Sequence, residues 1–299
     1  MTDILVLDVG HGNSALLTNG HTTVVIDAPS DVTLLRTLRR REVQAIDHLV
    51  VSHADEDHAG GVVPILLARD ISVRHVHLNP DPTRQTRGWE RLVAALEVAE
   101  QAGTEIHPEV STNSGPRLSF DDCRIDVLFP SAATAVRGVG GRLGGARLSA
   151  NSMSAVVRVE VAGNSVLFAG DADRIALESM RSRGVMLDAE VLIYPHHGGR
   201  AVMPSSPMAE QLFARDLTAA VGPRTVAFSH GRARHANPKP DAVKGVRTAR
   251  PDARIVCTQL SSHCASVVGS SFGHLTGDLS SGERHLTCCA GTLRLSADA

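Results

Sequence analysis

Short apolar runs and amphipathic runs follow one another along most of the chain. Runs of about four to eight apolar or β-branched residues between glycine, proline or asparagine are typical of buried strands. Such runs predict strands over Ile4–Asp8, Thr22–Asp27, His48–Ser52, Val73–Leu78, Arg124–Phe129, Ala155–Val161, Ser165–Ala169, Glu190–Tyr194, Thr225–Phe228 and Arg254–Thr258. Apolar positions with a helical period predict helices from Asp31 to about Arg41 and over Gly60–Ala68, Trp89–Gln101, Asp173–Arg183 and Asp241–Arg247.

Two turn dipeptides predict that some of these strands pair as hairpins. Asn19-Gly20 lies between the strands Ile4–Asp8 and Thr22–Asp27, and Gly163-Asn164 lies between two later strands. The remaining strands alternate with helices, which is typical of parallel pairing. The mixture predicts an α/β (α+β) fold in which two mixed β-sheets are flanked by helices, an αββα sandwich.

Composition places the chain among globular proteins and says little about its ligands. The 299 residues are 42% hydrophobic, which is enough to bury a sizeable core. A formal net charge of −2 provides no strong field that would attract nucleic acid or an anionic membrane. We expect one domain over residues 1–250 and a cysteine-containing C-terminal extension over residues 251–299, packed on that domain.

The sequence predicts a cytoplasmic protein with no membrane association. No apolar run approaches the ~20 residues that a membrane-spanning helix needs. The opening residues, from Met1 to Asp8, lack a basic segment and have the pattern of a strand, which argues against a signal peptide.

The strongest chemical signal is a loop that offers four metal ligands within six residues. Directly after an apolar strand come His53, Asp55, Asp57 and His58. In a strand-to-helix loop, successive side chains turn to different sides, so one loop can supply ligands to two neighbouring cations. Two divalent cations held close together activate water and neutralise the charge that develops on a scissile ester. This loop therefore predicts a dinuclear metal site.

Three further strand ends carry residues of the same kind. Asp171 follows one apolar strand across a single glycine, and an aspartate in that position can bridge two metals. His196 and His197 follow another strand and precede two glycines, an arrangement that suits a ligand and an outer hydrogen-bond partner. His235 follows a third strand; alone it would be taken as structural, but the other elements favour a functional role.

Taken together, these motifs resemble those of the metallo-β-lactamase superfamily. The matching segments are Leu7–Asn13, Ser52–Gly61, Asn151–Ser154, Gly170-Asp171, Pro195–Gly198 and the stretch from Ser229 to Pro238. Within the superfamily, the chain resembles the soluble hydrolase domain of ComEC-type competence proteins, where aspartate is typical at the position of Asp55. The resemblance covers roughly residues 4–245 and implies the αββα metallo-β-lactamase sandwich.

The resemblance also implies a set of metal ligands. His53 and Asp55 would bind one metal, while Asp57 and His58 would bind the other. Asp171 would bridge the two metals. Either His196 or His197 would complete the second site, and we favour His197, with His196 as an outer partner or a substrate contact.

Further residues take roles around these ligands. Asp57 would also orient the attacking water, and His235 would contact a substrate phosphate or assist the leaving group. Asp8, His11 and Asn151 would act as outer partners of the ligands. The chain departs from the family at His11 and Asn13, where glutamine and aspartate are common.

These inferences predict a metal-dependent hydrolase that binds two divalent ions, Zn²⁺ or Mn²⁺. The resemblance points to a phosphodiesterase or nuclease whose substrate is DNA or another phosphodiester. A small ester, a lactone or a cyclic nucleotide is the alternative substrate for the same site. A non-catalytic, metal-stabilised binding or regulatory module is a further alternative, although the full set of ligands argues against it.

Cysteines gather near the C-terminal end of the chain. Four of the five cysteines are Cys257, Cys264, Cys288 and Cys289. Four thiolates suit a tetrahedral structural Zn²⁺, although neither spacing matches the usual C-x2-C pattern. Buried thiols, or a disulfide or redox role, are the alternatives.

Overall fold

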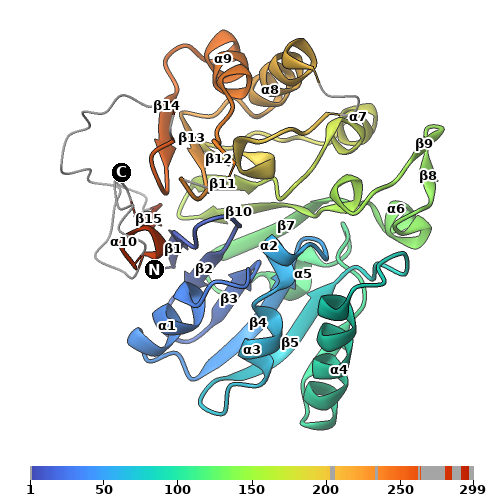
Figure 1. The fold of residues 1–299 in the computed structure, drawn as a ribbon, viewed down its shortest axis with the longest axis vertical. Helices are drawn as coiled ribbons and strands as arrows, with labels where there is room; N and C mark the ends of the chain where they lie inside the picture. The colour runs from blue at the N-terminus through green and yellow to red at the C-terminus, as the bar shows by residue number, and fades with distance from the viewer. Residues whose placement is uncertain are drawn as a thin grey trace.

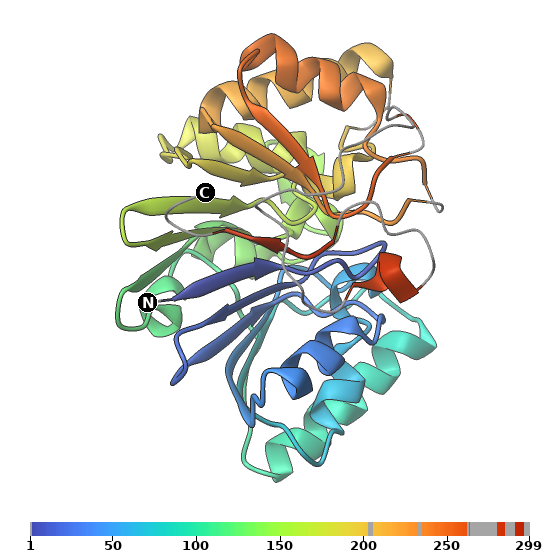
Figure 2. The ribbon, with the colours of Figure 1, turned by 90° about the vertical axis from the view of Figure 1, so that its left-hand side faces the viewer.

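Two β-sheets lie face to face, and helices cover the outer face of each (Figure 1). The computed structural model describes residues 2–202, 206–232, 235–261, 263, 280–284 and 291–295. Figure 2, which turns the molecule by 90°, shows the same succession of helices, sheet, sheet and helices. The predicted fold class, two mixed sheets flanked by helices, is confirmed.

The first sheet is mixed. In spatial order it comprises β15 (Leu293–Arg294), β1 (Asp3–Val6), β2 (Ala15–Thr18), β3 (Thr23–Ile26), β4 (Ala45–Val51), β5 (Ser72–Leu78) and β6 (Glu105–His107). β2 is antiparallel to both β1 and β3, and β4, β5 and β6 continue parallel to β3. Strands β1, β3 and β4 therefore point in the same direction, and their carboxyl ends lie at one edge.

The second sheet is also mixed, and several of its strands are parallel. In spatial order it comprises β14 (Arg254–Cys257), β13 (Thr225–Phe228), β12 (Val191–Ile193), β11 (Asn164–Phe168), β10 (Val156–Val161) and β7 (Cys123–Phe129). β10 pairs antiparallel with β7 and β11, whereas β11 to β14 are parallel. The carboxyl ends of β11, β12 and β13 therefore also lie together.

Three apolar layers hold these sheets and helices together. The outer face of the first sheet is covered by α1 (Thr33–Arg40), α3 (Val62–Leu66) and α4 (Arg87–Gln101). Leu34 of α1 and Leu92 of α4 are buried in this layer. Phe213 packs on the second sheet from α8 (Pro207–Val221), beside α7 (Arg174–Ser182) and α9 (Pro240–Ala249). The middle layer fills the space between the sheets. Each fully buried large aliphatic or aromatic side chain contributes about 1.5–3 kcal/mol.

The shorter elements lie in the connections. They are α2 (Glu56–Ala59), α5 (Gly115–Leu118), α6 (Ala132–Arg137), β8 (Arg142–Leu143), β9 (Ala146–Arg147), η1 (Asn151–Met153), η2 (Pro195–Gly198) and α10 (Ser281–Arg284). Among the helices that the structure describes, none combines the length and the apolar character that a membrane span requires.

Two of the differences from the prediction concern β2 and α8. Asn19-Gly20 joins β2 to β3, so the strand that pairs with Thr23–Ile26 across this turn is Ala15–Thr18 and not Ile4–Asp8. The helix α8 was not predicted, although its ends carry ordinary helix signals. The Ser206 hydroxyl accepts a hydrogen bond from the backbone of Ala209, and Gly222 ends the helix in the left-handed conformation.

The C-terminal segment joins both sheets. β14 is the outer strand of the second sheet, so the predicted boundary at residues 250 and 251 falls just before a strand of that sheet. β15 pairs antiparallel with β1 in the first sheet. Cys257 is the half-buried last residue of β14, and Cys264, Cys288 and Cys289 lie outside the described residues. The structural zinc at these cysteines stays a prediction.

The loop that carries the predicted ligands is held tightly against the loop after β3. The backbone of Ala28 donates to the carbonyl of His58 at 2.7 Å, and the backbone of Gly61 donates to the carbonyl of Ala28 at 2.7 Å. A Cβ at Gly61 would lie only 2.2 Å from the carbonyl oxygen of Pro29. Because that contact is with backbone, no side-chain rotation relieves it.

We therefore expect Gly61→Ala to lower the free energy of unfolding by roughly 1–3 kcal/mol, the cost of overpacking a close contact. The matched control is Gly88→Ala in the exposed first turn of α4, where a Cβ would meet no atom closer than 3.9 Å. That control should change stability by at most about 1 kcal/mol, and favourably. Urea denaturation measures both variants. Equal urea midpoints in the two variants would mean that the loop around Pro29 moves to accept the new Cβ without loss of stability.

Candidate metal centre

The ends of strands from both sheets meet where the sequence predicts the metal ligands. In the first sheet, His11 follows β1 and His53 follows β4. In the second sheet, Asp171 follows β11, and His196 and His197 follow β12. Because these strands are parallel within each sheet, residues far apart in sequence come together at one edge. Ligand sites of parallel sheets form at such carboxyl ends.

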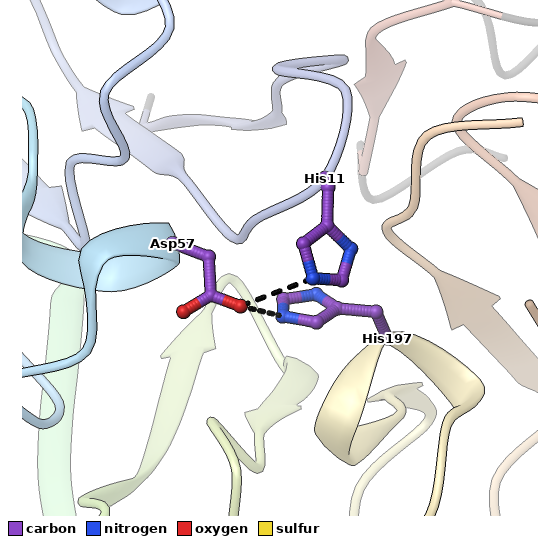
Figure 3. A group of neighbouring side chains, drawn as sticks. All are labelled: His11, Asp57 and His197. Carbon is purple, nitrogen blue, oxygen red and sulfur yellow. Dashed lines mark ion pairs between the residues drawn. The ribbon is translucent and has the colours of Figure 1, made fainter. Parts of the chain in front are cut away.

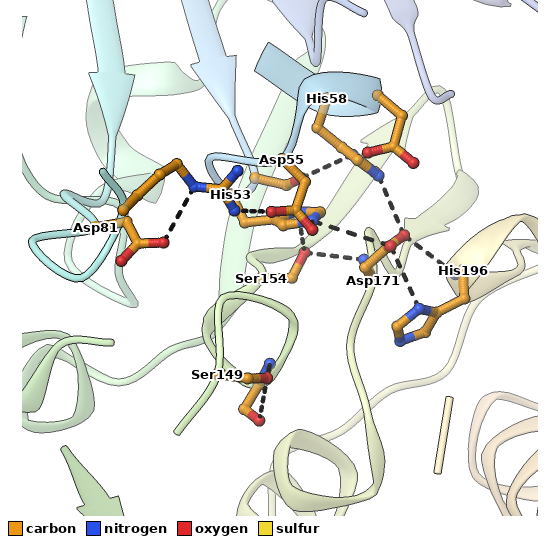
Figure 4. Close-up of polar contacts among 12 residues, drawn as sticks. His53, Asp55, His58, Asp81, Ser149, Ser154, Asp171 and His196 are labelled. Carbon is orange, nitrogen blue, oxygen red and sulfur yellow. Dashed lines mark hydrogen bonds and ion pairs between the residues drawn. The ribbon is translucent and has the colours of Figure 1, made fainter. Parts of the chain in front are cut away.

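Three buried side chains form the first group of ligand atoms. His53, His58 and Asp171 each offer one atom, and the three atoms lie within 4.8 Å of one another. His58 Nε2 lies 3.1 Å from Asp171 Oδ1, and His53 Nε2 lies 3.9 Å from Asp171 Oδ2. Figure 4 shows the two imidazoles directed towards this carboxylate.

A second group lies beside the first (Figure 3). Asp57 Oδ2 is 3.2 Å from His11 Nε2 and 3.4 Å from His197 Nε2. His197 Nε2 also lies 3.8 Å from Asp171 Oδ1, so Asp171 is shared between the two groups. This grouping differs from the ligand pairs that the resemblance implied, because His58 lies with His53 whereas Asp57 lies with His11.

The histidines present unpartnered nitrogens to this space. The Nε2 atoms of His53, His58 and His197 are buried and make no well-aligned hydrogen bond among the described residues; their near neighbours are the carboxylates of the two groups. Each Nδ1 atom is engaged. His58 Nδ1 contacts Asp27, His53 Nδ1 contacts serine hydroxyls, and His197 Nδ1 lies 3.0 Å from the Ser229 carbonyl. Buried polar atoms without a partner are costly, and neutral imidazole nitrogens beside carboxylates are suitable ligands for a divalent cation.

Electrostatics keep the two central carboxyls ionised. Burial alone would raise the pKa of Asp171, but the facing histidines outweigh burial and hold this pKa well below its ordinary value. Burial likewise opposes ionisation of Asp57, and the facing histidines, His11 and His197, lower its pKa. Against the opposing effect of burial, Asp27 and Asp171 raise the pKa of His58, so a cation at its Nε2 would replace a proton.

Asp27, Ser52 and Ser154 hold the ligands from behind and were not assigned by sequence reasoning. Asp27 Oδ2 lies 2.7 Å from His58 Nδ1, and Asp27 Oδ1 accepts from the backbone of Ser52 at 2.7 Å. Ser154 Oγ lies 3.2 Å from His53 Nδ1 and accepts from the backbone of Asp171 at 2.9 Å. For Asp27 a signal was present, because an aspartate at the end of a β-branched strand resembles the position of Asp171.

Asp55 has a second partner that the sequence did not reveal. Its Oδ2 lies 3.5 Å from His53 Nε2, within reach of the first group. Its other oxygen accepts from Arg84, whose Nε also donates to Asp81 at 3.3 Å. Asp55 is therefore held between a ligand histidine and a guanidinium, and its pKa is lowered despite burial.

The remaining predicted residues fall into two sets, of which the first lies at the centre. His196 Nδ1 lies 3.3 Å from Asp171 Oδ2. Both His196 and His197 have positive φ angles, 50° and 57°, a strained conformation that turns both rings towards the site. The exposed ring of His235 packs against His11, with ring centroids 4.2 Å apart.

The second set comprises Asp8 and Asn151. Asp8 is fully buried and binds the C-terminal segment: it accepts from Gln259 at 2.8 Å, from the backbone of Gly282 at 2.9 Å and from Ser280. Asn151 begins η1 and is half-buried, and no hydrogen bond or ion pair joins its side chain to the two ligand groups within the described part of the chain.

Comparison with known families agrees with this geometry. A family model described as the metallo-beta-lactamase superfamily matches residues 7–230. The chain belongs to this superfamily. Members of the superfamily are generally hydrolases, and the two His/Asp groups are candidate metal-binding groups.

Two solved structures are similar to this chain over most of their length. YhfI from Bacillus subtilis has 11% identity and a TM-score of 0.53, with 86% of this chain and 96% of YhfI covered. Zn²⁺-bound PqqB from Methylobacterium extorquens has 10% identity and a TM-score of 0.52, with 86% and 97% covered. At these identities, the likeness shows the fold alone. No protein of curated function matches the chain.

The contact between Asp27 and His58 predicts the effect of a single-atom change. In Asp27→Asn, the backbone of Ser52 keeps the amide oxygen, so the amide nitrogen faces His58 Nδ1. That arrangement favours the tautomer with its proton on Nε2, which blocks the ligand position. We expect divalent-metal affinity to fall about 10- to 100-fold in a folded protein, as for other outer partners. Competition with a chelator measures it, and unchanged affinity would contradict this role of Asp27.

Proposed function

We propose that the chain is a dinuclear metal-dependent phosphodiesterase, with DNA or another phosphodiester as its substrate. The observation that carries the proposal is the pair of ligand groups that share Asp171. The first group supplies two imidazoles and a carboxylate, and so does the second. Two adjoining groups of this kind suit hydrolysis, because in-line displacement at phosphorus develops charge on both the attacking and the leaving oxygen.

The donor set fits two divalent cations, and zinc fits it best. His53, His58 and Asp171 would hold one cation, while His11, Asp57 and His197 would hold the other. Imidazole-rich sets suit Zn²⁺, and the additional oxygen of Asp55 is compatible with Mn²⁺. When bound, such cations supply Lewis acidity that polarises a phosphodiester and makes water a stronger nucleophile.

The residues around the ligands would position the reactants. Asp57 is ionised and its side chain is 26% exposed, so it can hold a water molecule that enters from solvent. The exposed ring of His235, which packs against His11 at a tilt of 45°, can donate a hydrogen bond to a phosphate oxygen or to the leaving group. His196, beside Asp171, is a second donor at the same edge.

A phosphodiester is favoured over other esters by the sequence resemblance to ComEC-type hydrolase domains and by the donors at the rim. Arg84 lies beside Asp55 and directs its guanidinium to the ligand loop. The net charge of −2 does not favour an extended nucleic-acid surface, so we expect contact with a few phosphates and little sequence selectivity.

We expect Asp57→Ala to lower hydrolysis by at least 100-fold, more than the loss of an outer partner costs, because it removes both a ligand and the water-positioning carboxylate. The matched control is Glu56→Ala, an exposed carboxylate one residue earlier in α2, which should retain activity. Both variants should keep the circular dichroism spectrum of the parent. Equal loss in the two variants, or unchanged turnover in Asp57→Ala, would reject the assignment.

Substrate class is tested with a panel on the protein loaded with Zn²⁺ or Mn²⁺. The panel contains single- and double-stranded DNA, bis-p-nitrophenyl phosphate, a cyclic nucleotide, a carboxylic ester and a lactone. We expect turnover of the acyclic phosphodiesters. Turnover confined to the carboxylic ester, the lactone or the cyclic nucleotide would overturn the proposal, as would a metal-loaded protein without activity on any member.

A further inference from the structure

Five polar side chains with metal-binding chemistry lie on one face of the first sheet, away from the centre described above. They are His48 on β4, His75 and His77 on β5, and Glu105 and His107 on β6. The strand register places His75 beside Glu105 and His77 beside His107. Residues two apart in a strand face the same side, so this cluster follows from the alternation of the strands.

We propose that His75, Glu105 and His107 form a third metal site, which binds a zinc-class transition-metal ion. His75 Nδ1 lies 3.2 Å from His107 Nε2 and 3.3 Å from Glu105 Oε2. His107 Nε2 lies 3.7 Å from the same carboxylate oxygen. Ligands about 2.0–2.1 Å from a tetrahedral Zn²⁺ are about 3.3–3.4 Å apart, so the triangle already has the required size.

The two remaining histidines support the ligand rings from the buried side. His48 stacks on His75 with ring centroids 4.8 Å apart, and His77 stacks on His107 at 4.4 Å. His48 Nδ1 and His77 Nε2 are themselves 3.0 Å apart. These contacts fix the planes of the two ligand rings before any ion binds, which lowers the ordering cost of binding.

The site is open on one side and lies at the edge of the sheet. The side chain of Glu105 is 67% exposed, and those of His75 and His107 are 29% and 21% exposed. An ion can enter from solvent, and water can occupy the fourth coordination position.

β6 is a three-residue outer strand that pairs only with β5 among the described strands. An ion bound by residues of both strands would therefore hold β6 in the sheet.

The test compares bound zinc in full-length protein variants. Wild type, the double variant Glu105→Gln/His107→Asn and the control Glu97→Gln/His21→Asn are dialysed against buffered micromolar Zn²⁺ and analysed by mass spectrometry. Glu97 and His21 are exposed and lie outside the cluster. We expect the double variant to bind one equivalent fewer than wild type and the control, with unchanged hydrolysis. The difference between variants reports this site, whatever the hydrolytic centre binds.

Equal zinc content in all three proteins would overturn the proposal. If the double variant does not fold, the single variant Glu105→Gln provides the test, because its exposed side chain can change without disturbing the core. Its third equivalent should bind at least tenfold more weakly than in wild type, and the rise in thermal midpoint on adding Zn²⁺ should shrink. An unchanged third affinity in that variant would reject the site.

Discussion

The buried carboxylate of Asp171 is the group on which the candidate centre depends. An ionised carboxylate away from water is costly unless opposite charges or hydrogen bonds compensate it. Here, His58, His196 and His197 face it from two different loops, and its Oδ1 accepts a hydrogen bond from the backbone of His196 at 3.2 Å. The same compensation draws both ligand groups together, since each contributes a ring that lies within 4 Å of this one side chain.

The two-sheet architecture explains how these loops meet. Strands of both sheets deliver their carboxyl ends to one edge, so ligands more than a hundred residues apart in sequence become neighbours. Asp27, serine hydroxyls and the Ser229 carbonyl then fix the rings of His53, His58 and His197 by their Nδ1 atoms. The fold therefore orients the histidine rings before a cation arrives. Their orientation is set by hydrogen bonds to residues at the ends of strands.

Sequence reasoning recovered the sandwich and the ligand loop because both have local patterns. Alternating apolar runs predicted most strands, and the loop from His53 to His58 is unusual enough to indicate metal chemistry. It could not predict that His58 groups with His53 while Asp57 groups with His11, because a turn of α2 directs neighbouring side chains to different places. Nor could it predict that Arg84 holds Asp55, a contact between separate loops. β2 was missed because its short apolar run follows a glycine-rich turn.

The hydrogen bonds that join Asp8 to the C-terminal segment have a consequence for the order in which the chain folds during synthesis. The backbone of Asp8 donates to Thr292, 284 residues later, and β15 pairs with the strand that leads to His11. At a synthesis rate of ~5–20 residues per second, roughly 15–60 s separate the two partners on the ribosome. During that interval β1 lacks its outer neighbour, and the Asp8 carboxyl lacks the donors that bury it. Closure of the first sheet therefore waits until residues 292–294 have been synthesised, and until then the nascent chain has an open strand edge.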